Sequence, residues 1–309
     1  YEICSRDWSS DVCSSDLLVF VEDSAVVAAL ARPGIEAETL LPSASLSKSL
    51  TALGVGQALC AGHLRLDDEA RTWLPDLGGT PLGQARLRDI LRMASGASET
   101  ETKHTHGFTF EETRDVLWAR SVRELVNLPR NVQTGARGRA FDYKSTDPYL
   151  AALMVQEATR QPFTRWLHEQ VFMPAGVSGP YVLDTDRQGN FLATGGVRLS
   201  LVDWIRLGLF IREQRDQNSC LGHYVREMGR TQLAIPKITG INGYFGGYGY
   251  FSWTDNERVP QSVWAVGAQG QRLGWSTRAG DLRLFLAFGD GTDADMGRIY
   301  PLAQQWLNR

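Results

Sequence analysis

The sequence predicts an α+β protein of the α/β sandwich type, in which both ends of the chain build one antiparallel sheet flanked by helices. Three observations lead to this prediction. Residues 18–22 and 25–31 are short, apolar and partly β-branched, which is typical of strands. Residues 43–237 hold many stretches with helical spacing, and strand-like segments return over residues 238–309. The sheet is therefore expected from about residues 18–42 and 238–309, with an inserted helical subdomain between them.

The individual elements follow from local signals. The first two strands are separated by two polar residues and should form a hairpin. A helix is expected over residues 49–61 because Gly62 closes its apolar run. Pro148 and Asp203 favour two later helices, since each falls in a first turn. Further helices are expected over residues 87–94, 110–127, 148–159, 163–172, 201–213, 224–230 and 301–308. Further strands are expected over residues 262–266, 272–275 and 282–288.

The composition is that of an ordinary globular protein, with 309 residues, 43% of them hydrophobic, and a formal net charge of −3. This length fits one large domain or two intertwined ones. The basic residues are scattered and form no stripe, so we expect no nucleic-acid partner. No apolar stretch reaches the length of a membrane span. We expect a small-molecule partner, and the sequence leaves the oligomeric state open.

Residues 1–17 are polar, serine-rich and without apolar periodicity. Residues 7–17 back-translate in one reading frame to a common sequencing-library adapter, and residues 1–3 fit its upstream part. We therefore expect residues 1–17 to be an unstructured assembly artefact, followed by a single domain over residues 18–309. On this expectation the natural start lies upstream of Leu18 and is missing, so the compartment stays open.

Cys4 and Cys13 fall within that segment, which leaves Cys60 and Cys220. Two cysteines so far apart along the chain can form a disulfide or remain thiols. Because Cys60 lies in an apolar helical run, we expect two buried thiols.

Ser45 and Lys48 form a Ser-x-x-Lys at the start of the first helix. Residues three apart on a helix share a face, so the hydroxyl and the amine can touch. A serine hydroxyl is a poor nucleophile unless a base takes its proton, and a lysine at a helix N-terminus can be that base. The pair therefore indicates an acyl-transferring serine enzyme. The alternative is a serine that merely caps the helix.

Two other patterns carry weaker signals. His104 and His106 form a His-x-His, but no Cys or carboxylate follows at ligand spacing, so we expect no metal site. Residues 244–253 alternate glycine with aromatic residues. They could line an acyl pocket or pack at a sheet edge, and we favour packing.

Five segments in order resemble the serine β-lactamase and penicillin-binding-protein family. The resemblance is closest to the class C-like branch, which includes esterases and 6-aminohexanoate-dimer hydrolases. It extends over nearly all of residues 18–309 and implies a β-lactamase/transpeptidase-like fold with no metal or organic cofactor. The matching segments are residues 43–52, 62–69, 88–96, 141–145 and 172–177.

The resemblance assigns roles to three side chains. Ser45 would be the nucleophile that forms an acyl-enzyme, and Lys48 would hold or remove its proton, although the base in such sites is disputed. Tyr143 would help to accept that proton and return it to the leaving group. A phenol needs a nearby cation to do so, and Lys48 or Lys144 could provide it. The alternative for Tyr143 is a buried aromatic beside a turn.

Two departures from the family pattern matter. Ser145 stands where the family usually has Asn, and its shorter hydroxyl is a candidate substrate contact. Residues 264–271 resemble the Gly-x-x-Gly-Gln of the aminohexanoate-oligomer hydrolases. If Gly267 is the glycine of this third motif, Ala265 replaces its cation. This loss disfavours a site for the carboxylate of a β-lactam or a peptide terminus.

The main chain is less sensitive to such changes. By the same resemblance, the backbone N–H groups of Ser45 and Ala268 would form the oxyanion hole. Gly267 would allow close approach of the substrate. Gln269 and Gln271 are candidate substrate contacts, and the alternative for both is a solvated loop at a strand end.

The sequence therefore favours a serine hydrolase that cleaves a small ester or amide. A β-lactamase or D-Ala-D-Ala carboxypeptidase is the alternative within the same fold. A non-catalytic binding or sensor protein on that fold is the second alternative.

Overall fold

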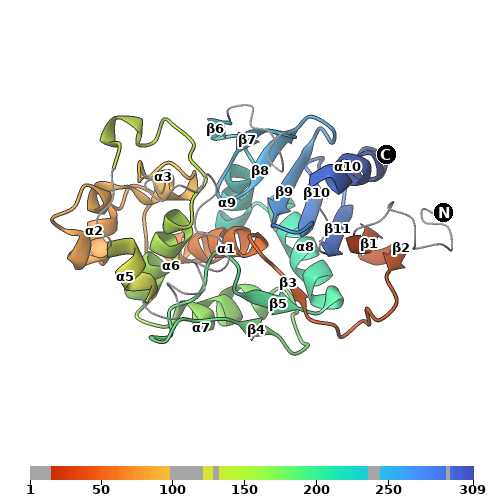
Figure 1. Ribbon diagram of the computed structural model, residues 1–309, viewed down its shortest axis with the longest axis horizontal. Coiled ribbons are helices and arrows are strands. Elements are labelled where there is room, and N and C mark those ends of the chain that lie inside the picture. The colour runs from red at the N-terminus through yellow and green to blue at the C-terminus, as the bar shows by residue number, and fades with distance from the viewer. Residues whose placement is uncertain (1–14, 98–120, 128–131, 236–243, 290–292) are drawn as a thin grey trace.

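One antiparallel sheet joins the two ends of the chain. The computed structural model describes residues 15–97, 121–127, 132–235, 244–289 and 293–309. Within them an eight-stranded sheet runs in the order β2-β1-β11-β10-β9-β8-β7-β6, which confirms the α+β prediction (Figure 1). Its strands are β1 (Ser15–Glu22), β2 (Ala25–Ala31), β6 (Leu233–Ala234), β7 (Phe245–Tyr248), β8 (Trp253–Asn256), β9 (Ser262–Val266), β10 (Arg272–Ser276) and β11 (Leu284–Gly289).

The centre of this sheet is covered on both faces. Leu17, Leu18, Val19, Phe20 and Val21 of β1 are all buried, as expected of a strand with apolar neighbours on both sides. Two helices, α8 and α10, both pack on β11. These contacts explain why β1, β9 and β11 read as continuous apolar runs.

The prediction of no structure over residues 1–17 is wrong for its last three residues. Ser15, Asp16 and Leu17 lie in β1, where Leu17 pairs with Phe288 of β11. The ladder uses backbone N–H and C=O groups, which any residue except proline offers. A segment of unrelated origin can therefore extend a strand that continues into Leu18. Residues 1–14 lie outside the described residues, and the adapter origin stays a prediction.

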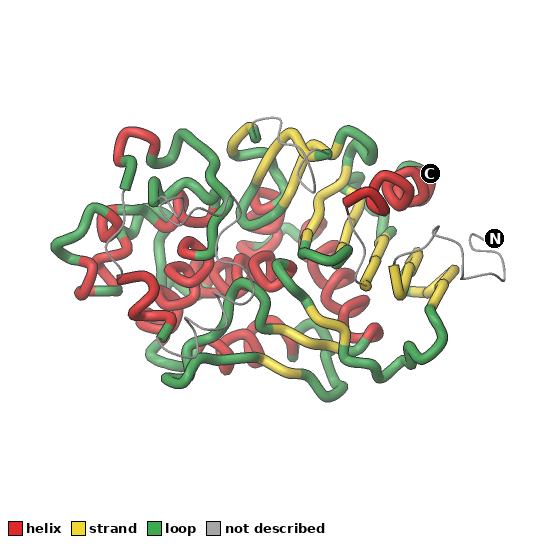
Figure 2. The backbone as a smooth tube through the Cα atoms, in the orientation of Figure 1, coloured by secondary structure: helices red, strands yellow, loops and turns green. Residues whose placement is uncertain are grey.

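The helices fill the middle of the chain. Figure 2 shows them, in red, gathered on one side of the sheet, with one helix beyond it near the C-terminus. The α-helices are α1 (Leu46–Cys60), α2 (Ala70–Trp73), α3 (Leu87–Leu91), α5 (Val122–Asn127), α6 (Thr146–Thr159), α7 (Phe163–Leu167), α8 (Leu201–Asp216), α9 (Cys220–Met228) and α10 (Asp293–Leu307). The 3₁₀ turns are η1 (Pro75–Leu77), η2 (Leu82–Gln84) and η3 (Thr134–Ala136), and η4 (His168–Phe172) is a π-helical continuation of α7.

The first helix lies in the middle of the molecule, between the helical block and the sheet (Figure 1). It packs against α6, α7 and α9 on the helical side and against β9 on the sheet side. Nearly all of its residues are buried, which explains why its sequence is apolar all round rather than on one stripe.

A small second sheet leads into this helix. It has the order β3-β5-β4, from β3 (Leu41–Pro42), β5 (Val197–Leu199) and β4 (Val182–Leu183). These strands have two or three residues each, too few to show an alternation, and sequence analysis missed them. They matter because β3 ends three residues before Ser45.

Two element boundaries differ from expectation. The terminal helix begins at Asp293, and Pro301 lies in its interior rather than at its start. Proline is disfavoured in a helix interior, where it removes one backbone hydrogen bond and crowds the carbonyl four residues earlier, yet α10 contains one. Of the helix expected over 110–127, residues 121–127 are described: Val122–Asn127 is helical, whereas Ser121 is not.

The expectation of two buried thiols is wrong, because Cys60 and Cys220 form a disulfide. Their Cα atoms are 5.7 Å apart, within the ordinary range for such a bond. Cys60 ends α1 and Cys220 begins α9, two helices that pack together. The packing of two distant segments, which composition does not reveal, brings the sulfur atoms together.

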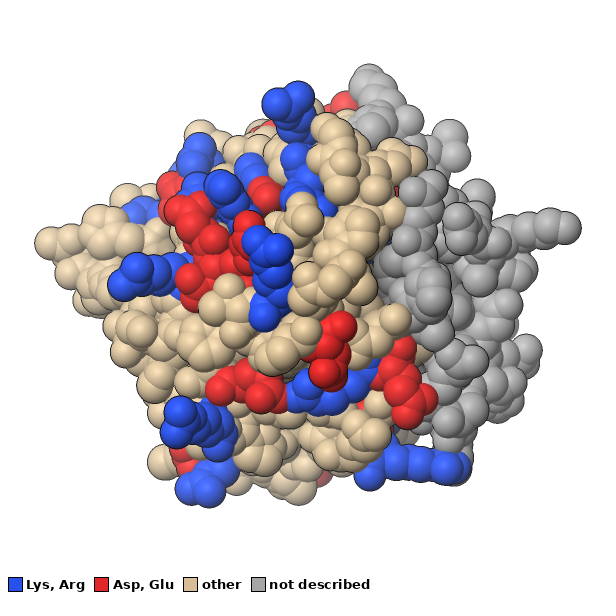
Figure 3. All heavy atoms as spheres, turned by 90° about the vertical axis from the view of Figure 1, so that its left-hand side faces the viewer, with Lys and Arg blue, Asp and Glu red and all other residues tan. Residues whose placement is uncertain are grey.

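Charged side chains of both signs are intermingled on the face of the helical block that Figure 3 shows. Ion pairs account for such mixing, for example Arg88 with Asp67 at 2.7 Å and Arg71 with Glu69 at 2.6 Å. None of the helices in the described ranges combines the length and the apolar character needed to cross a membrane.

Candidate active site

Ser45 and Lys48 meet at the N-terminus of α1. The Lys48 Nζ donates a hydrogen bond to the Ser45 Oγ at 2.7 Å. Ser45 is the N-cap residue of the helix, yet its side chain makes no capping hydrogen bond. The hydroxyl therefore bonds to the amine and does not cap the helix, which argues against the capping alternative.

The turn before Ser45 is held from several sides. The Ser43 N–H donates to the Val197 carbonyl at 2.8 Å, and the Ser43 Oγ accepts from the Val197 N–H at 3.2 Å. Ala44 has a left-handed φ of 41°, which costs energy in any residue with a side chain. Ser47, inside the helix, donates to the Ala193 carbonyl at 2.9 Å. These contacts fix where the Ser45 hydroxyl points.

Tyr143 lies close to Lys48 as well. The Lys48 Nζ is 4.9 Å from the centroid of the Tyr143 ring, a cation–π distance. The ring also packs on Trp253 and Tyr248, with centroids 5.3 and 6.4 Å away. Burial raises the pKa of Tyr248 well above its ordinary value, and the charges of Tyr143 and Asp147 add to this rise.

The aromatic residues of the glycine-rich run form this packing. Phe245, Tyr248, Tyr250, Phe251 and Trp253 are all buried. Trp253 contacts both Phe245 and Tyr248. The structure thus agrees with the packing interpretation. Two of these residues, Tyr248 and Trp253, pack against the Tyr143 ring.

Lys144, the other cation considered for Tyr143, is held elsewhere. Its fully buried Nζ donates to the Asp142 carbonyl at 2.7 Å and to the Met93 carbonyl at 3.3 Å. It also forms ion pairs with the carboxylates of Asp142 and Asp147, at 3.4 and 3.9 Å. Among the described residues Lys48 has no carboxylate at such a distance, so the two lysines differ in their partners.

The end of β9 lies against the turn that carries Ser45. A Cβ atom added to Gly267 would lie 2.7 Å from the Ser43 carbonyl oxygen and 3.0 Å from the Ala44 Cβ, so only glycine fits there without a shift. Among the described residues, the backbone N–H groups of Ser45 and Ala268 have no hydrogen-bond acceptor. Two neighbouring free donors are what an oxyanion hole requires.

The substrate-contact candidates differ in their surroundings. Gln269 is exposed and has a left-handed φ of 58°. Gln271 is buried; its amide nitrogen donates to the Gly289 carbonyl at 2.7 Å, and its amide oxygen accepts from the Gly289 N–H at 3.1 Å. Ser145 is the half-buried N-cap residue of α6, two residues after Tyr143. The structure thus leaves Gln269 available at the surface, whereas the amide of Gln271 holds the strand ends.

Sequence analysis missed one charged residue of this region, Arg272. Its side chain is fully buried, and its Nη1 donates to the Gly267 carbonyl at 2.5 Å and to the Gln271 carbonyl at 2.8 Å. Its Nε lies 3.1 Å from the Tyr300 hydroxyl of α10. The position of Arg272 directly after the third motif was the only signal available, because its partners come from the β9–β10 turn and from a distant helix.

A cavity of about 730 Å³ lies elsewhere, at the Ser262 end of β9. Arg215, His223 and Arg226 line one of its walls. Because Gly267 follows the opposite end of that strand, this cavity is not part of the site around Ser45.

No group of three or more potential metal ligands occurs within the described ranges. His104 and His106, the pair considered above, lie outside those ranges.

Comparisons with known proteins identify the fold and the family of this chain. The family model described as Beta-lactamase matches residues 13–277. A Bacteroides dorei protein provisionally classed as a beta-lactamase superposes with a TM-score of 0.72 at 19% identity, over 96% of this chain and 95% of that chain. A Bacillus anthracis protein provisionally classed as a 6-aminohexanoate-dimer hydrolase gives 0.73 at 17%, over 93% and 77%. EstCE1, a hydrolase with promiscuous acyltransferase activity, gives 0.71 at 15%, over 94% and 92%.

These structural likenesses, at identities of 20% or less, show the shared fold, and the family model extends over most of the chain. The resemblance drawn from the five sequence segments is thereby confirmed. The chain belongs to the beta-lactamase family.

Proposed function

We propose that this protein is a serine hydrolase that cleaves a small ester or amide through an acyl intermediate on Ser45. The observation that carries the proposal is the 2.7 Å hydrogen bond between Lys48 and a Ser45 hydroxyl that caps no helix. A serine needs such a neighbouring base to attack a carbonyl at neutral pH.

In the proposed reaction the Ser45 Oγ attacks the substrate carbonyl carbon while its proton passes to the base, which is either Lys48 acting as a free amine or Tyr143 acting as a phenolate beside the Lys48 cation. The N–H groups of Ser45 and Ala268 stabilise the negative charge that develops on the carbonyl oxygen, worth about 3 kcal/mol per donor. Tyr143 then protonates the departing alcohol or amine. Water, activated by the same groups, attacks the acyl-enzyme and releases the acid.

The third motif supports an ester or amide over a β-lactam. Ala265, at the position of the motif cation, is neutral and buried in β9, so it offers no charge to a substrate carboxylate. Ser145 and Gln269 remain candidate contacts for the substrate, whereas the bonded amide of Gln271 argues for a supporting role.

The proposal is tested with the Ser45→Ala variant and a fluorophosphonate probe. We expect the folded wild type to be labelled on Ser45 and to hydrolyse p-nitrophenyl esters, and the variant to lose both properties while its melting curve stays nearly unchanged. Absence of labelling in folded wild-type protein would favour a binding or sensor protein. Parallel assays with nitrocefin and a linear aminohexanoate dimer separate the substrate classes, since nitrocefin turnover that matches ester turnover would favour the β-lactamase alternative.

A further inference from the structure

Arg272 occupies a place where a buried charge acts on the proposed oxyanion hole. It begins β10 and pairs with Val266 at the end of β9. From there its guanidinium reaches back to the Gly267 carbonyl, at 2.5 Å. It also bonds to the Gln271 carbonyl, which in turn accepts the Gly267 N–H at 2.8 Å. The guanidinium thus bonds to the carbonyls at the two ends of the β9–β10 turn, those of Gly267 and Gln271.

The Gly267 carbonyl and the Ala268 N–H belong to one peptide group. Resonance couples the two ends of a peptide bond, so a charged donor on the oxygen draws electrons from the nitrogen and makes the N–H a stronger donor. Hydrogen bonds in a chain polarise one another in this way, by about 10–30% per bond. Arg272 therefore acts on the N–H group of Ala268, one of the two donors proposed for the oxyanion hole.

The charge of Arg272 is not compensated nearby. Among the described residues no carboxylate lies within ion-pair distance of its guanidinium, and its Nη2 has no hydrogen-bond partner. A buried charge without a counterion is costly for stability. In a region of low dielectric, the same charge strongly favours any negative charge that develops close to it.

We propose that Arg272 is a positioning residue for the oxyanion hole, and that it supplies from the next strand the positive charge that the third motif lacks at Ala265. It acts through the Gly267–Ala268 peptide group and does not touch the substrate. This inference rests on the proposed function, since it concerns the oxyanion of the acylation step. It predicts that Arg272 stabilises the transition state and leaves substrate binding unchanged.

The test compares Arg272→Gln and Arg272→Lys with the wild type. Rates of p-nitrophenyl acetate hydrolysis are normalised to the number of active sites, measured as fluorophosphonate labelling at its end point. We expect Arg272→Gln to lower kcat/KM and kcat at least tenfold with little change in KM, because only a transition-state interaction is weakened. Arg272→Lys keeps the positive charge but loses the fork of donors, so its rate per site should fall clearly less than that of Arg272→Gln.

A second readout uses phenylboronic acid, whose tetrahedral adduct with a serine places a negative oxygen in the oxyanion hole. Its affinity should fall in Arg272→Gln by the same factor as kcat/KM, as expected of a transition-state mimic. A merely structural role for Arg272 would lower the number of active sites and would leave the rate and the boronate affinity per site unchanged.

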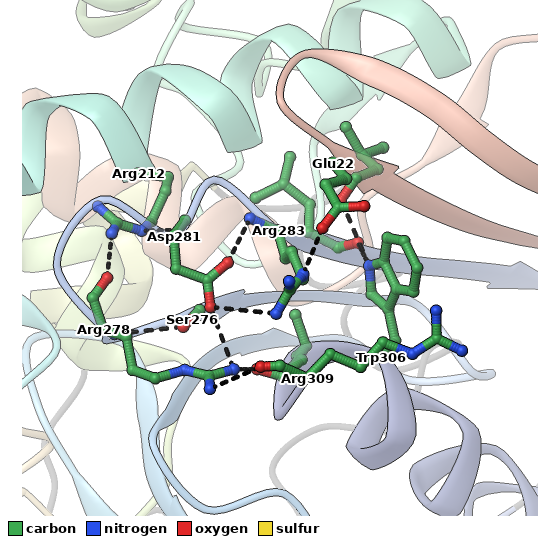
Figure 4. A network of polar contacts seen from close by, with 11 residues as sticks. Glu22, Arg212, Ser276, Arg278, Asp281, Arg283, Trp306 and Arg309 are labelled. Carbon is green, nitrogen blue, oxygen red and sulfur yellow. Dashed lines mark hydrogen bonds and ion pairs between the residues drawn. The ribbon is translucent and has the colours of Figure 1, made fainter.

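Arg212 provides the matched control. It is also fully buried, and its Nε donates to the Asp281 carbonyl at 2.6 Å in the polar network of Figure 4. That network contacts Ser276, at the end of β10 opposite to Arg272. Its Nη2 donates to the Arg278 carbonyl, and its Nη1 lies 2.9 Å from the Asp216 carboxylate. Arg212→Gln should lower the melting temperature while activity per site stays at the wild-type level.

The outcomes separate the two proposals. If the wild type labels and turns over esters but Arg272→Gln equals it per site, the role of Arg272 is overturned and the serine hydrolase stands. If Arg212→Gln loses as much activity per site as Arg272→Gln, the effect is general and the role of Arg272 is again overturned. If folded wild type neither labels nor turns over any ester or amide, both proposals fall.

Discussion

The surroundings of Arg272 and Arg212 differ in one respect. Both side chains are fully buried and both bond to backbone carbonyls. Arg212 has the carboxylate of Asp216 at 2.9 Å, in a network that also joins Glu22 to Arg283 (Figure 4). Arg272 has no carboxylate at ion-pair distance among the described residues. The charge of Arg212 is thus neutralised by a carboxylate in a network that stabilises the fold. The charge of Arg272 has no such partner and lies where a negative charge is expected to form in the reaction.

The two buried lysines of the described ranges repeat this difference. Lys144 is paired with Asp142 and Asp147, whereas Lys48 contacts the Ser45 hydroxyl and the ring of Tyr143. The buried cations without a carboxylate are thus the two that adjoin the proposed oxyanion and the proposed nucleophile. Pairing with a carboxylate therefore separates the buried cations that hold the structure from those that we propose to serve the reaction.

The largest expected effect is on activity, at Lys48. Lys48→Met removes the proposed base, so kcat/KM for p-nitrophenyl esters should fall about a thousandfold, within the range of general base catalysis. The free energy of unfolding should change by less than about 1 kcal/mol, because no carboxylate is left unpaired. Ester assays and urea unfolding measure the two quantities. A large loss of stability with little loss of activity would show that Lys48 serves the structure, as Lys144 does, and would contradict the difference drawn between the two lysines.

The next effect is on stability, at Lys144. Lys144→Met leaves the fully buried carboxylate of Asp147 without this partner, and the free energy of unfolding should fall by about 3 kcal/mol or more. Urea unfolding measures the change. The double variant Lys144→Met with Asp147→Asn should recover part of the loss, and a double variant that is less stable than the single one would contradict the explanation.

Tyr143→Phe sharpens the comparison by removing one hydroxyl only. The ring stays, so its packing on Trp253 and its contact with Lys48 are kept. We expect kcat to fall about a hundredfold, the scale of lost acid–base help, with an unchanged melting curve. Turnover near the wild-type level would remove Tyr143 from the proposed mechanism.

The smallest expected effect is on the pH dependence of stability, at Tyr248. Burial raises the pKa of its hydroxyl, and the charges of Tyr143 and Asp147 both add to this rise. Its pKa is raised above the ordinary value of 10.0, so its contribution to stability is complete below pH 10. This contribution is lost as the pH rises further, because the Tyr248 hydroxyl ionises in the unfolded chain at a pH where it is still protonated in the folded protein. Tyr248→Phe should make the alkaline loss of stability shallower, by up to about 1.4 kcal/mol per pH unit above pH 10. Urea unfolding between pH 9 and 11 tests this, and an equal slope in both proteins would contradict it.

The parts of the site that follow from local spacing could be predicted from the sequence. Ser45 and Lys48 are one helical turn apart, and any helix over that stretch brings them together. The strands β9 and β10 have clear apolar runs and were predicted almost to the residue. The prediction for Tyr143 depended on the place of its segment among the five that resemble the family, because nothing in its immediate sequence shows that the side chain lies near Lys48.

Features that depend on distant partners could not be predicted. The role of Arg272 rests on the β9–β10 register and on Tyr300 of α10. The apolar surroundings of Cys60 suggested a buried thiol, whereas the position of α9 decided its pairing. The tertiary contacts of a side chain, rather than its own sequence context, fixed the outcome in both cases.

The Cys60–Cys220 bond also bears on where the chain matures. Cys220 is exposed at the first residue of α9, so solvent thiols can reach the bond. Disulfides persist in oxidising compartments and are rare in a reducing cytosol. The redox state of these two sulfur atoms in living cells therefore indicates the compartment in which the protein resides. Alkylation of free thiols at lysis, followed by peptide mapping, measures that state.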